Sequence, residues 1–440
     1  MQRFYCGIDL GTTNLKVLLC DEAGHVAAKA SCPTPRQERD GAPVTDPVEI
    51  LTAIEALLDD AWSQAGRGGR IAAIASAGVG EDGFLVGPDL SPTDLSIPWF
   101  DRRAEAEAAE LAACCDVTAL SGIAFEPTRT ATKWLWLARH GAAPPAGALW
   151  LALTDWPLVA WSGRPVMTEA LAARTACWDI ARREWINAAL RAAKAPPLPP
   201  VLPAGAVIGP LLEGSFPVRL GAADTGTLAV CGGHDHPTAA AAIRAAHPGA
   251  IVDSLGTAEL LYAEAEAEIL PAEALVRTIP SGPGMVAACL HVFEFDRYFS
   301  AFPPDRLRAE LDGTAPQDAV TPRIRARLET AAMVAAQVLT RMEAAGIPPG
   351  ELFVTGGRAR SDRLMQLRAD VLGRAIRRVE ERELCGLGAA IIAASGAGQA
   401  VAPVLKTRLF TPDAGAATAH AAECARRQEE ITALLLHGPR

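Results

Sequence analysis

The densest set of reactive side chains lies in "AVCGGHDHPTAAAAI", residues 229–243, where His234, Asp235 and His236 follow two glycines. A carboxylate in such a place can take up a proton during a reaction, and two imidazoles with a carboxylate can also hold a transition metal. Pro237 suits the first turn of a helix, so we expect Asp235 near a helix N-terminus, where the dipole favours its ionised form. General base, metal ligand and plain helix start all stay open.

A second polar group forms the turn of "IDLGTTNLKVLL", residues 8–19. Glycine in a tight turn lets the backbone approach an anion, while exposed amides and threonine hydroxyls donate hydrogen bonds to phosphate oxygens. The residues that fit this description are Gly11, Thr12 and Thr13. Asp9 is placed to hold Mg²⁺ directly or through water, and Lys16 to reach phosphate as a point charge. An ordinary β turn uses the same residue types, so this alternative stays open.

The pattern returns in "VDSLGTAELLYA", residues 252–263, which again reads as strand, Leu-Gly-Thr turn and strand. A duplicated hairpin predicts a second tip at Gly256 and Thr257. Two such tips facing one another across a cleft can hold a polyphosphate.

A third glycine-rich segment is "ELFVTGGRARSDRLMQLRADVLG", residues 351–373. A strand that ends in Gly356 and Gly357 lets a flat base lie against the backbone at the carboxyl edge of a sheet, where α/β folds bind ligands. A helix is predicted to begin near Ser361, which is equally suited to be only its cap. The chain has no Walker A motif, and no convincing G-x-G-x-x-G follows a strand, so a P-loop is excluded and a dinucleotide fold is disfavoured.

These turns need strands and helices to hold them, and the sequence predicts both. The 440 residues suffice for two large or three small domains, and the chain is 50% hydrophobic but only 5% aromatic, which favours helices packed on strands. Strands are predicted at 4–9, 15–20, 26–30 and 71–80, and a helix at 47–62. The proline cluster at 196–203 predicts an irregular surface connection near a hinge or domain edge.

Charge and cysteine use exclude several classes of protein. The formal net charge of −10 opposes a nucleic-acid surface, which needs clustered Lys and Arg. Ten cysteines without a C-x-x-C pair indicate reduced thiols and no zinc ribbon. No signal-peptide pattern begins the sequence, and no window of 18 apolar residues occurs. We therefore expect a soluble cytoplasmic protein without nucleic-acid or membrane partners.

The two Leu-Gly-Thr hairpins, "GGHD" and "VTGG", taken together, resemble the FGGY family of sugar and polyol kinases, and more distantly the actin-like ATPases. The segments "SIPWFDRRA", "TATKWLWLARH" and "TEALAARTACWDI" also look like family segments. The resemblance implies an α/β fold of two actin-like, ribonuclease H-like domains with a cleft between them, at residues 1–243 and 244–440. It implies ATP and Mg²⁺ as cofactors, a small sugar or polyol substrate, and a possible homodimer.

The resemblance also assigns roles to residues. Asp235 matches the family's general base toward the substrate hydroxyl, which agrees with phosphoryl transfer by positioning, Mg²⁺ and proton uptake. The acceptor contacts implied by the resemblance are Glu81, Asp82, Trp99 and Asp101, and we also expect His234 and Arg129 to contact the acceptor. Carboxylates accept bonds from adjacent hydroxyls, and an indole face covers a carbon backbone. Core packing for Trp99 and a salt bridge of Asp101 with a neighbouring arginine stay open.

The acceptor loop departs from better-known relatives. Xylulokinases resemble one another in a Gln-Met-His-Gly loop and glycerol kinases in Arg-Glu-Thr, whereas residues 80–83 here are Gly-Glu-Asp-Gly. Neither substrate can be transferred to this chain. Arg129 stands where relatives often have an apolar or aromatic residue, which leaves open an anionic acceptor, an unusually short polar acceptor, or simple surface exposure of Arg129.

We therefore expect ATP-dependent phosphorylation of a hydroxyl of a small ketose or polyol, with Mg-ATP held between the two domains. Two alternatives remain: a non-enzymatic actin-like nucleotide-binding or filament protein, and a metal-dependent hydrolase that uses His234 and His236.

Overall fold

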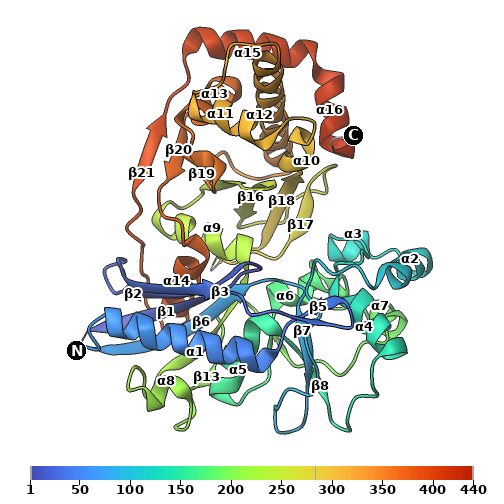
Figure 1. Ribbon diagram of the computed structural model, residues 1–440, viewed down its shortest axis with the longest axis vertical. Coiled ribbons are helices and arrows are strands. Elements are labelled where there is room, and N and C mark those ends of the chain that lie inside the picture. The colour runs from blue at the N-terminus through green and yellow to red at the C-terminus, as the bar shows by residue number, and fades with distance from the viewer. Residues whose placement is uncertain (1, 283, 439–440) are drawn as a thin grey trace. The chain divides into compact units, whose positions relative to one another are not determined.

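A computed structural model of the chain describes residues 2–282 and 284–438 (Figure 1). The chain forms two compact units. Unit 1 comprises residues 1–246, 278–284 and 383–404, and unit 2 comprises residues 247–277, 285–382 and 405–440. Each unit is built around one large mixed β-sheet with helices on its faces.

Unit 1 contains a six-stranded sheet in the order β13-β14-β6-β1-β2-β3. Its strands are β1 (Arg3–Leu10), β2 (Asn14–Asp21), β3 (Val26–Pro33), β6 (Arg70–Gly78), β13 (Val207–Pro210) and β14 (Leu228–His234). The short strands of the same unit are β4 (Gln37–Arg39), β5 (Ala42–Val44), β7 (Gly83–Val86), β8 (Leu149–Ala152), β9 (Met167–Thr168), β10 (Trp178–Asp179), β11 (Glu184–Trp185) and β12 (Val201–Leu202).

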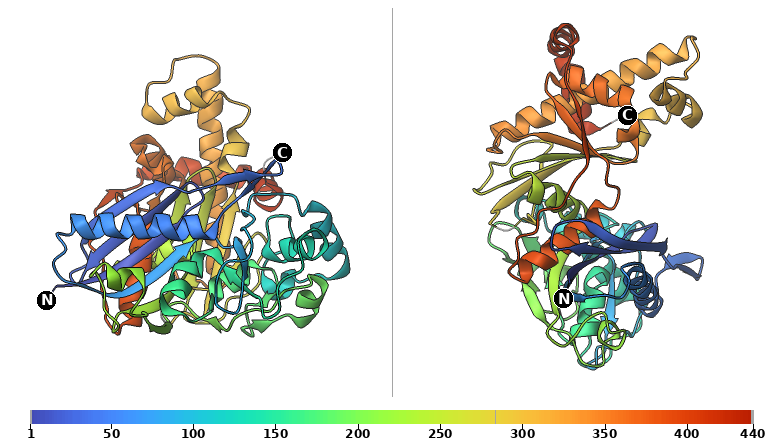
Figure 2. Two further views of the ribbon diagram at one scale, coloured as in Figure 1. Left: turned by 60° about the horizontal axis from the view of Figure 1, so that its bottom comes forward. Right: turned by 90° about the vertical axis from the view of Figure 1, so that its left-hand side faces the viewer.

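The helices of unit 1 are α1 (Pro47–Gln64), α2 (Glu105–Cys114), α3 (Thr118–Ser121), α4 (Thr130–His140), α5 (Trp156–Ser162), α6 (Glu169–Arg174), α7 (Asn187–Ala192), α8 (Phe216–Arg219), α9 (Asp235–Ala246) and α14 (Leu384–Gly396), with the 3₁₀ turn η1 (Leu153–Asp155). Helix α1 begins cleanly because Asp46 caps it and Pro47 occupies its first turn. It packs on β2 and β3, as the blue helix across the strands shows (Figure 2, left).

Helix α14 packs on β1, β6 and β14, so strand β1 is buried almost throughout. This packing is unusually close. A Cβ atom on Gly7 would lie 1.8 Å from the carbonyl oxygen of Gly386, so the strand and the helix can approach this closely only with glycine at position 7. The sequence segment 383–404 therefore belongs to unit 1, although it lies far along the chain.

Unit 2 contains a seven-stranded sheet in the order β17-β18-β16-β15-β19-β20-β21. Its strands are β15 (Ile251–Leu255), β16 (Glu259–Ala265), β17 (Val276–Thr278), β18 (Ala287–Phe293), β19 (Leu352–Thr355), β20 (Ile376–Val379) and β21 (Thr407–Phe410). Its helices are α10 (Phe295–Phe299), α11 (Pro304–Asp312), α12 (Val320–Ala344), α13 (Asp362–Leu372), α15 (Ala414–Arg426) and α16 (Gln428–His437), with the 3₁₀ turn η2 (Arg358–Arg360).

The two sheets share one plan. In unit 1 the antiparallel meander β1-β2-β3 adds the parallel strands β6 and β14 beside β1; in unit 2 the antiparallel strands β15-β16-β18 add the parallel strands β19 and β20 beside β15. The duplication predicted from the two Leu-Gly-Thr segments is thus present as two equivalent hairpins. The predicted α/β class with two actin-like domains is confirmed.

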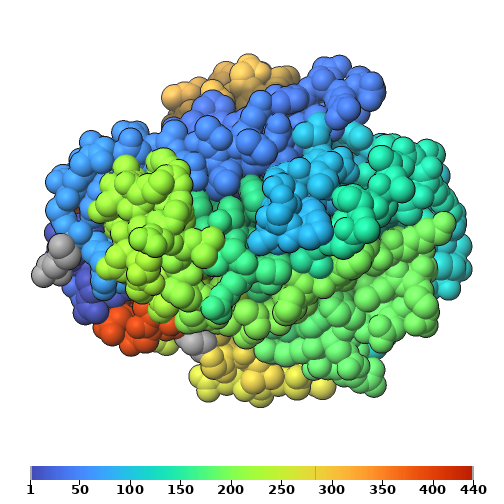
Figure 3. Space-filling view, turned by 90° about the horizontal axis from the view of Figure 1, so that it is seen from below, coloured from blue at the N-terminus to red at the C-terminus, as the bar shows by residue number. Residues whose placement is uncertain are grey.

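The elements predicted from periodicity are confirmed to within a few residues: strands at 4–9, 15–20, 26–30 and 71–80, and the helix at 47–62. The proline cluster at 196–203 lies within unit 1 and contributes the short strand β12, so it does not mark a boundary between the two units along the chain. Green segments near residue 200 lie at the surface of this unit (Figure 3). The division at residues 243 and 244 stays a prediction for the family domains.

Candidate active site

The first hairpin places Asp9 and Lys16 opposite one another on β1 and β2. Lys16 Nζ lies 3.1 Å from Asp9 Oδ2 and 2.9 Å from Glu383 Oε2. Burial raises the pKa of Asp9, opposed by Lys16 and by a hydrogen bond from the Cys385 thiol. Lys16 is therefore held between two carboxylates, and its contact with a phosphate stays a prediction.

The tip of this hairpin is Gly11, Thr12 and Thr13. Four donors from outside the hairpin contact it. The Thr34 hydroxyl donates to the Gly11 carbonyl at 2.7 Å and the Thr34 N–H to the Thr13 carbonyl at 3.0 Å, while Arg36 donates to the Thr12 carbonyl at 2.5 Å and the Trp99 indole to the Thr12 hydroxyl at 2.8 Å. The tip is thus a supported turn rather than a free loop.

Glu81 lies in the loop after β6 and is buried. Arg129 Nη1 donates to its Oε1 at 2.9 Å and Arg174 Nε to the same oxygen at 2.8 Å. Burial alone raises the pKa of Glu81, but Arg174, His234 and Arg129 outweigh it and hold the pKa at about 2. Glu81 is therefore a carboxylate held between two guanidinium groups.

Asp82 is also buried, but its surroundings raise its pKa, whereas those of Glu81 lower the pKa of that residue. Burial raises its pKa to about 6, although Lys133 lowers it and the backbone N–H of Trp99 donates to it. Among the described residues, Asp82 Oδ1 has no hydrogen-bond partner. The Lys133 amine donates to the carbonyls of Ile97 and Pro98, at 3.1 and 2.8 Å, which fixes the segment carrying Trp99. Asp82 therefore offers an unpaired buried acceptor oxygen.

The remaining acceptor candidates are divided by the structure. Arg103 donates to both carboxylate oxygens of Asp101 at 2.9 Å, which is the salt bridge that the sequence left open. Trp99 is partly exposed and not in the core. Arg129 is not freely exposed, because it also donates to Glu126 Oε2 at 2.6 Å. A substrate contact of each of these residues stays a prediction.

Asp235 is the first residue of α9, directly after the buried strand β14, as Pro237 predicted. The backbone N–H of His236 donates to its Oδ1 at 2.6 Å, and His234 Nε2 lies 3.3 Å from the same oxygen. Burial raises the pKa of Asp235, but the two histidines and the N–H outweigh it and lower the pKa. Burial lowers the pKa of His234 to about 4, so this imidazole is neutral at pH 7.

In the part of the chain that the structure describes, no group of three or more His, Cys, Asp or Glu side chains is arranged to hold a metal ion. Across residues 2–282 and 284–438, no helix is both long and apolar enough to span a membrane.

In unit 2, Gly256 and Thr257 form the tip between β15 and β16. Gly356 follows β19 with φ of 96°, and a Cβ atom there would lie 2.4 Å from the Leu255 carbonyl oxygen, so glycine is required. Ser361 caps α13 by accepting from the Leu364 N–H at 3.1 Å, and its hydroxyl donates to the Leu311 carbonyl. Its hydroxyl is therefore engaged, and its contact with ATP stays a prediction.

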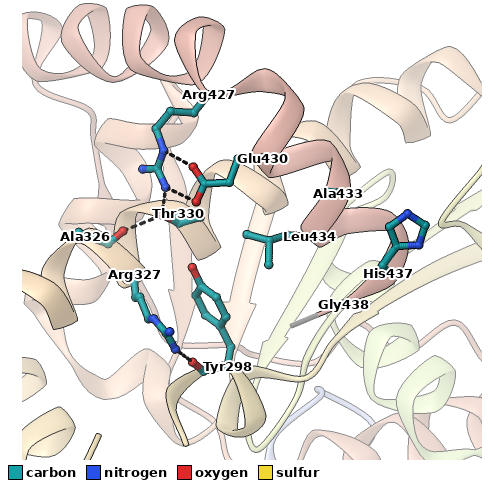
Figure 4. A pocket seen from close by; sticks show the side chains of 10 residues that line it. All are labelled: Tyr298, Ala326, Arg327, Thr330, Arg427, Glu430, Ala433, Leu434, His437 and Gly438. Carbon is teal, nitrogen blue, oxygen red and sulfur yellow. Dashed lines mark hydrogen bonds and ion pairs between the residues drawn. The ribbon is translucent and has the colours of Figure 1, made fainter. Parts of the chain in front are cut away.

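A separate pocket of about 400 Å³ lies among α10, α12 and α16 of unit 2 (Figure 4). Arg427 is paired there with Glu430 and Thr330, and Arg327 donates to the Tyr298 carbonyl. None of the residues predicted from the sequence lines this pocket.

Comparison with known proteins identifies the family of the chain. The sequence matches the N-terminal domain of the FGGY family of carbohydrate kinases over residues 4–242 and the C-terminal domain over residues 258–397. This chain belongs to the FGGY family of carbohydrate kinases. The family predicted from the ordered motifs is thereby confirmed. Carbohydrate kinases are phosphotransferases that transfer a phosphoryl group onto an alcohol oxygen, so the chain belongs to an enzyme family.

Relatives of this FGGY kinase act on different substrates. The glycerol kinase of Acidovorax sp. (strain JS42) is 27% identical, with 90% of this chain and 91% of the relative covered. The structure of the xylulose kinase from Rhodospirillum rubrum superposes with a TM-score of 0.85 at 21% identity, over 100% of both chains. The Plasmodium falciparum glycerol kinase with ADP superposes with a TM-score of 0.79 at 16% identity, over 98% of each chain.

Several residues of this FGGY kinase that surround the candidate site were not predicted from the sequence. These are Arg36, Lys133, Arg174, Arg358 and Glu383. Four of them contact a predicted residue far away in the chain, and Lys133 donates to the carbonyls of Ile97 and Pro98 just before Trp99. No local spacing signals such contacts. The single arginine of "ALAARTACW" and the three of "GGRARSDR" are visible in the sequence, but only the fold shows which residues they contact.

Proposed function

We propose that this protein is an ATP- and Mg²⁺-dependent kinase that phosphorylates a hydroxyl of a small ketose or polyol, with Asp235 as the general base. The observation that carries the proposal is the state of Asp235: a half-buried carboxylate at the start of α9 whose pKa is lowered, so that it is ionised and able to take up a proton at pH 7. Such a base is what transfer to an alcohol requires.

Asp9 suits a magnesium ion. It is a buried carboxylate on the first hairpin, and the charge of Asp235 is near enough to raise its pKa, which a bound cation would offset. Mg²⁺ in phosphoryl-transfer enzymes is held by one or two carboxylates together with phosphate oxygens and water, so Asp9 fits as such a ligand. When bound, the ion neutralises charge on the transferring phosphoryl group. Asp9 is the residue that we assign to it.

The acceptor is expected to lie against Asp82, whose buried Oδ1 lacks a partner among the described residues. A sugar hydroxyl donates a hydrogen bond to such an oxygen and removes the cost of burying it unpaired. Trp99 offers an indole face for the carbon chain. His234, neutral at pH 7, is suited to hydrogen-bond a second hydroxyl.

A neutral acceptor is favoured over a sugar acid. Arg129 is the residue that left an anionic acceptor open, but its guanidinium is engaged by Glu81 and Glu126. Arg174 is likewise engaged by Glu81. A carboxylate on the substrate would compete with existing ion pairs rather than meet a free cation.

The test is acceptor-stimulated release of ADP from Mg-ATP by the full chain, with a panel of C3 to C6 ketoses, polyols and sugar acids. The proposal predicts that one neutral ketose or polyol raises ADP release well above the basal rate and forms a phosphate monoester detectable by ³¹P NMR. Stimulation by sugar acids alone would overturn the neutral acceptor, and no stimulation by any member of the panel would overturn the kinase assignment.

A further inference from the structure

Each of the two glycine-threonine turns of this chain is contacted by an arginine that lies outside its own Leu-Gly-Thr segment. In unit 1, Arg36 donates to the carbonyl oxygen of Thr12 at 2.5 Å, and its guanidinium lies 4.5 Å from the centre of the Phe100 ring. In unit 2, Arg358 Nε donates to the carbonyl oxygen of Gly256 at 2.9 Å, and its guanidinium lies 4.7 Å from the centre of the Phe295 ring. Each turn thus has one arginine, stacked on one phenylalanine, bonded to one tip carbonyl.

The geometry of the peptide group gives this contact a consequence. A trans peptide is planar, so the carbonyl of one residue and the N–H of the next point in opposite directions. When Arg358 fixes the Gly256 carbonyl, it also aims the N–H of Thr257 away from itself. When Arg36 fixes the Thr12 carbonyl, it aims the N–H of Thr13 in the same manner.

Additional donors complete the arrangement. The backbone N–H of Asp296 donates to the Thr257 carbonyl at 3.0 Å, and the Thr34 hydroxyl donates to the Gly11 carbonyl at 2.7 Å. The carbonyls of both tips, which would repel a phosphate, thus accept hydrogen bonds from donors of the protein. Among the described residues no acceptor is found for the N–H of Thr257, and Thr257 is exposed. Its N–H is available to an anion.

Arg358 is fixed more firmly than an isolated surface cation. Arg358 is half-buried, also forms an ion pair with Asp296, and follows directly after the Gly356-Gly357 step. A guanidinium donates in a fixed planar fork and stacks on an aromatic ring at the same time, which a lysine ammonium cannot do.

We propose that Arg358 and Arg36 are a matched pair of positioning residues that aim the backbone N–H groups of the two glycine-threonine turns at nucleotide phosphates. The inference rests on the proposed function, because it takes the turns as phosphate-binding. Neither arginine contacts phosphate in this scheme; each acts through the peptide that it holds.

The experiment measures binding of Mg-ATP and of adenosine to the full chain by calorimetry, for the wild type, R358A, R358K and R360A. Arg360 is an exposed arginine two positions away, so R360A removes the same charge without touching the turn. We expect R358A to bind ATP about tenfold more weakly or worse, because a hydrogen bond to a charged group is misaligned. R360A stays within about twofold of wild type, and adenosine affinity stays within about twofold throughout, because only the phosphates meet the aimed N–H groups.

R358K keeps the positive charge but loses the planar fork of the guanidinium, so it separates positioning from charge. It also provides the test if R358A does not fold. Positioning predicts that R358K also loses most of the ATP affinity, whereas wild-type ATP affinity in R358K would overturn it. Equal losses of ATP and adenosine affinity in R358A, or equal ATP affinity of R358A and R360A, would also overturn it. A wild type that binds no ATP would overturn the proposed function instead. R36A and R39A form the corresponding pair for the first turn, since Arg39 is exposed nearby.

Discussion

Arg174 donates two hydrogen bonds to a single carboxylate oxygen of Glu81, although the two residues are 93 positions apart. Arg174 is the last residue of α6, and Glu81 lies in the loop after β6. The contact joins the loop after β6 to the layer of short elements beside the sheet. It also explains how a fully ionised glutamate is tolerated in a buried place.

Replacing Arg174 by alanine should destabilise the protein and weaken acceptor binding. Glu81 would keep Arg129 but lose its other guanidinium, and an under-compensated buried carboxylate costs about 1–3 kcal/mol. Chemical denaturation should show a loss of this size for R174A, together with a higher KM for the acceptor. R182A is the control, since Arg182 is exposed and pairs with Asp179 at 3.4 Å, and such pairs contribute little. Equal stability of R174A and R182A would contradict the role assigned to this contact.

Local patterns in the sequence were sufficient for the hairpins but not for the surroundings of the site. The Leu-Gly-Thr turns and the Gly-Gly step carry their own backbone chemistry, so Gly11, Gly256 and Gly356 could be placed in advance. Contacts made across the fold could not. Glu383 reaches Lys16 only because α14 packs on β1, and that packing depends on the close approach of Gly7 and Gly386. No periodicity within either segment encodes such a meeting.

Asp235→Asn should remove transfer while leaving nucleotide binding intact. The amide is nearly the same size and still accepts the N–H of His236, but it cannot take up a proton. General-base assistance is typically about 10²- to 10⁴-fold, so kcat should fall by this factor. Calorimetry with ATP should give an affinity within a few-fold of wild type. A D235N variant with undiminished kcat would remove Asp235 from the mechanism.

Acceptor binding should weaken in mild acid because of Asp82. Burial raises the pKa of this carboxyl to about 6, so it is ionised above that pH and protonated below it. Only the ionised form offers both oxygens as acceptors to hydroxyl groups. The KM for the acceptor should therefore rise as the pH falls from 7 to 5, while the KM for ATP changes less. In D82N the KM for the acceptor should be high and should not rise further as the pH falls from 7 to 5. A pH profile of D82N parallel to that of the wild type would contradict the assignment.

The stability of unit 2 should fall in acid through His291. This buried residue of β18 is hydrogen-bonded to the backbone of Leu435 in α16, and burial lowers its pKa from 6.5 to about 4. Because the folded pKa is below the unfolded one, the stabilising contribution is complete above pH 6.5 and is lost as the pH falls toward 4. One proton taken up on unfolding gives a slope of about 1.4 kcal/mol per pH unit in this window.

Thermal or urea unfolding of wild type and H291Q between pH 4 and 7 measures this slope. H291Q removes the titrating group, so its stability should depend less steeply on pH by about one proton. H25Q is the control, since the His25 side chain is exposed and its loss should leave the slope unchanged. Identical slopes for H291Q and wild type would show that another group governs the acid response.

The second hairpin is joined to α13 by a buried ion cluster whose integrity should limit the stability of unit 2. Arg368 Nη2 lies 2.5 Å from Asp253 Oδ2 and 2.7 Å from Glu259 Oε1, and all three side chains are almost completely buried. Burial and Glu259 raise the pKa of Asp253, against the lowering effect of Arg368. Removing the guanidinium leaves two carboxyl groups facing one another without a cation. Breaking a buried ion pair in this manner typically costs about 3–5 kcal/mol.

R368A should therefore unfold at lower urea concentration than R363A, its control on the same helix, where Arg363 is half-exposed. The loss should be larger at pH 8 than at pH 5, because without Arg368 the folded pKa of Asp253 rises further, and stability then falls as the pH rises through it. The triple variant R368M/D253V/E259L removes all three charges and should recover most of the loss, since a well-packed apolar cluster replaces an ionic one at little cost. If R368A is as stable as R363A at both pH values, the cluster does not hold the hairpin.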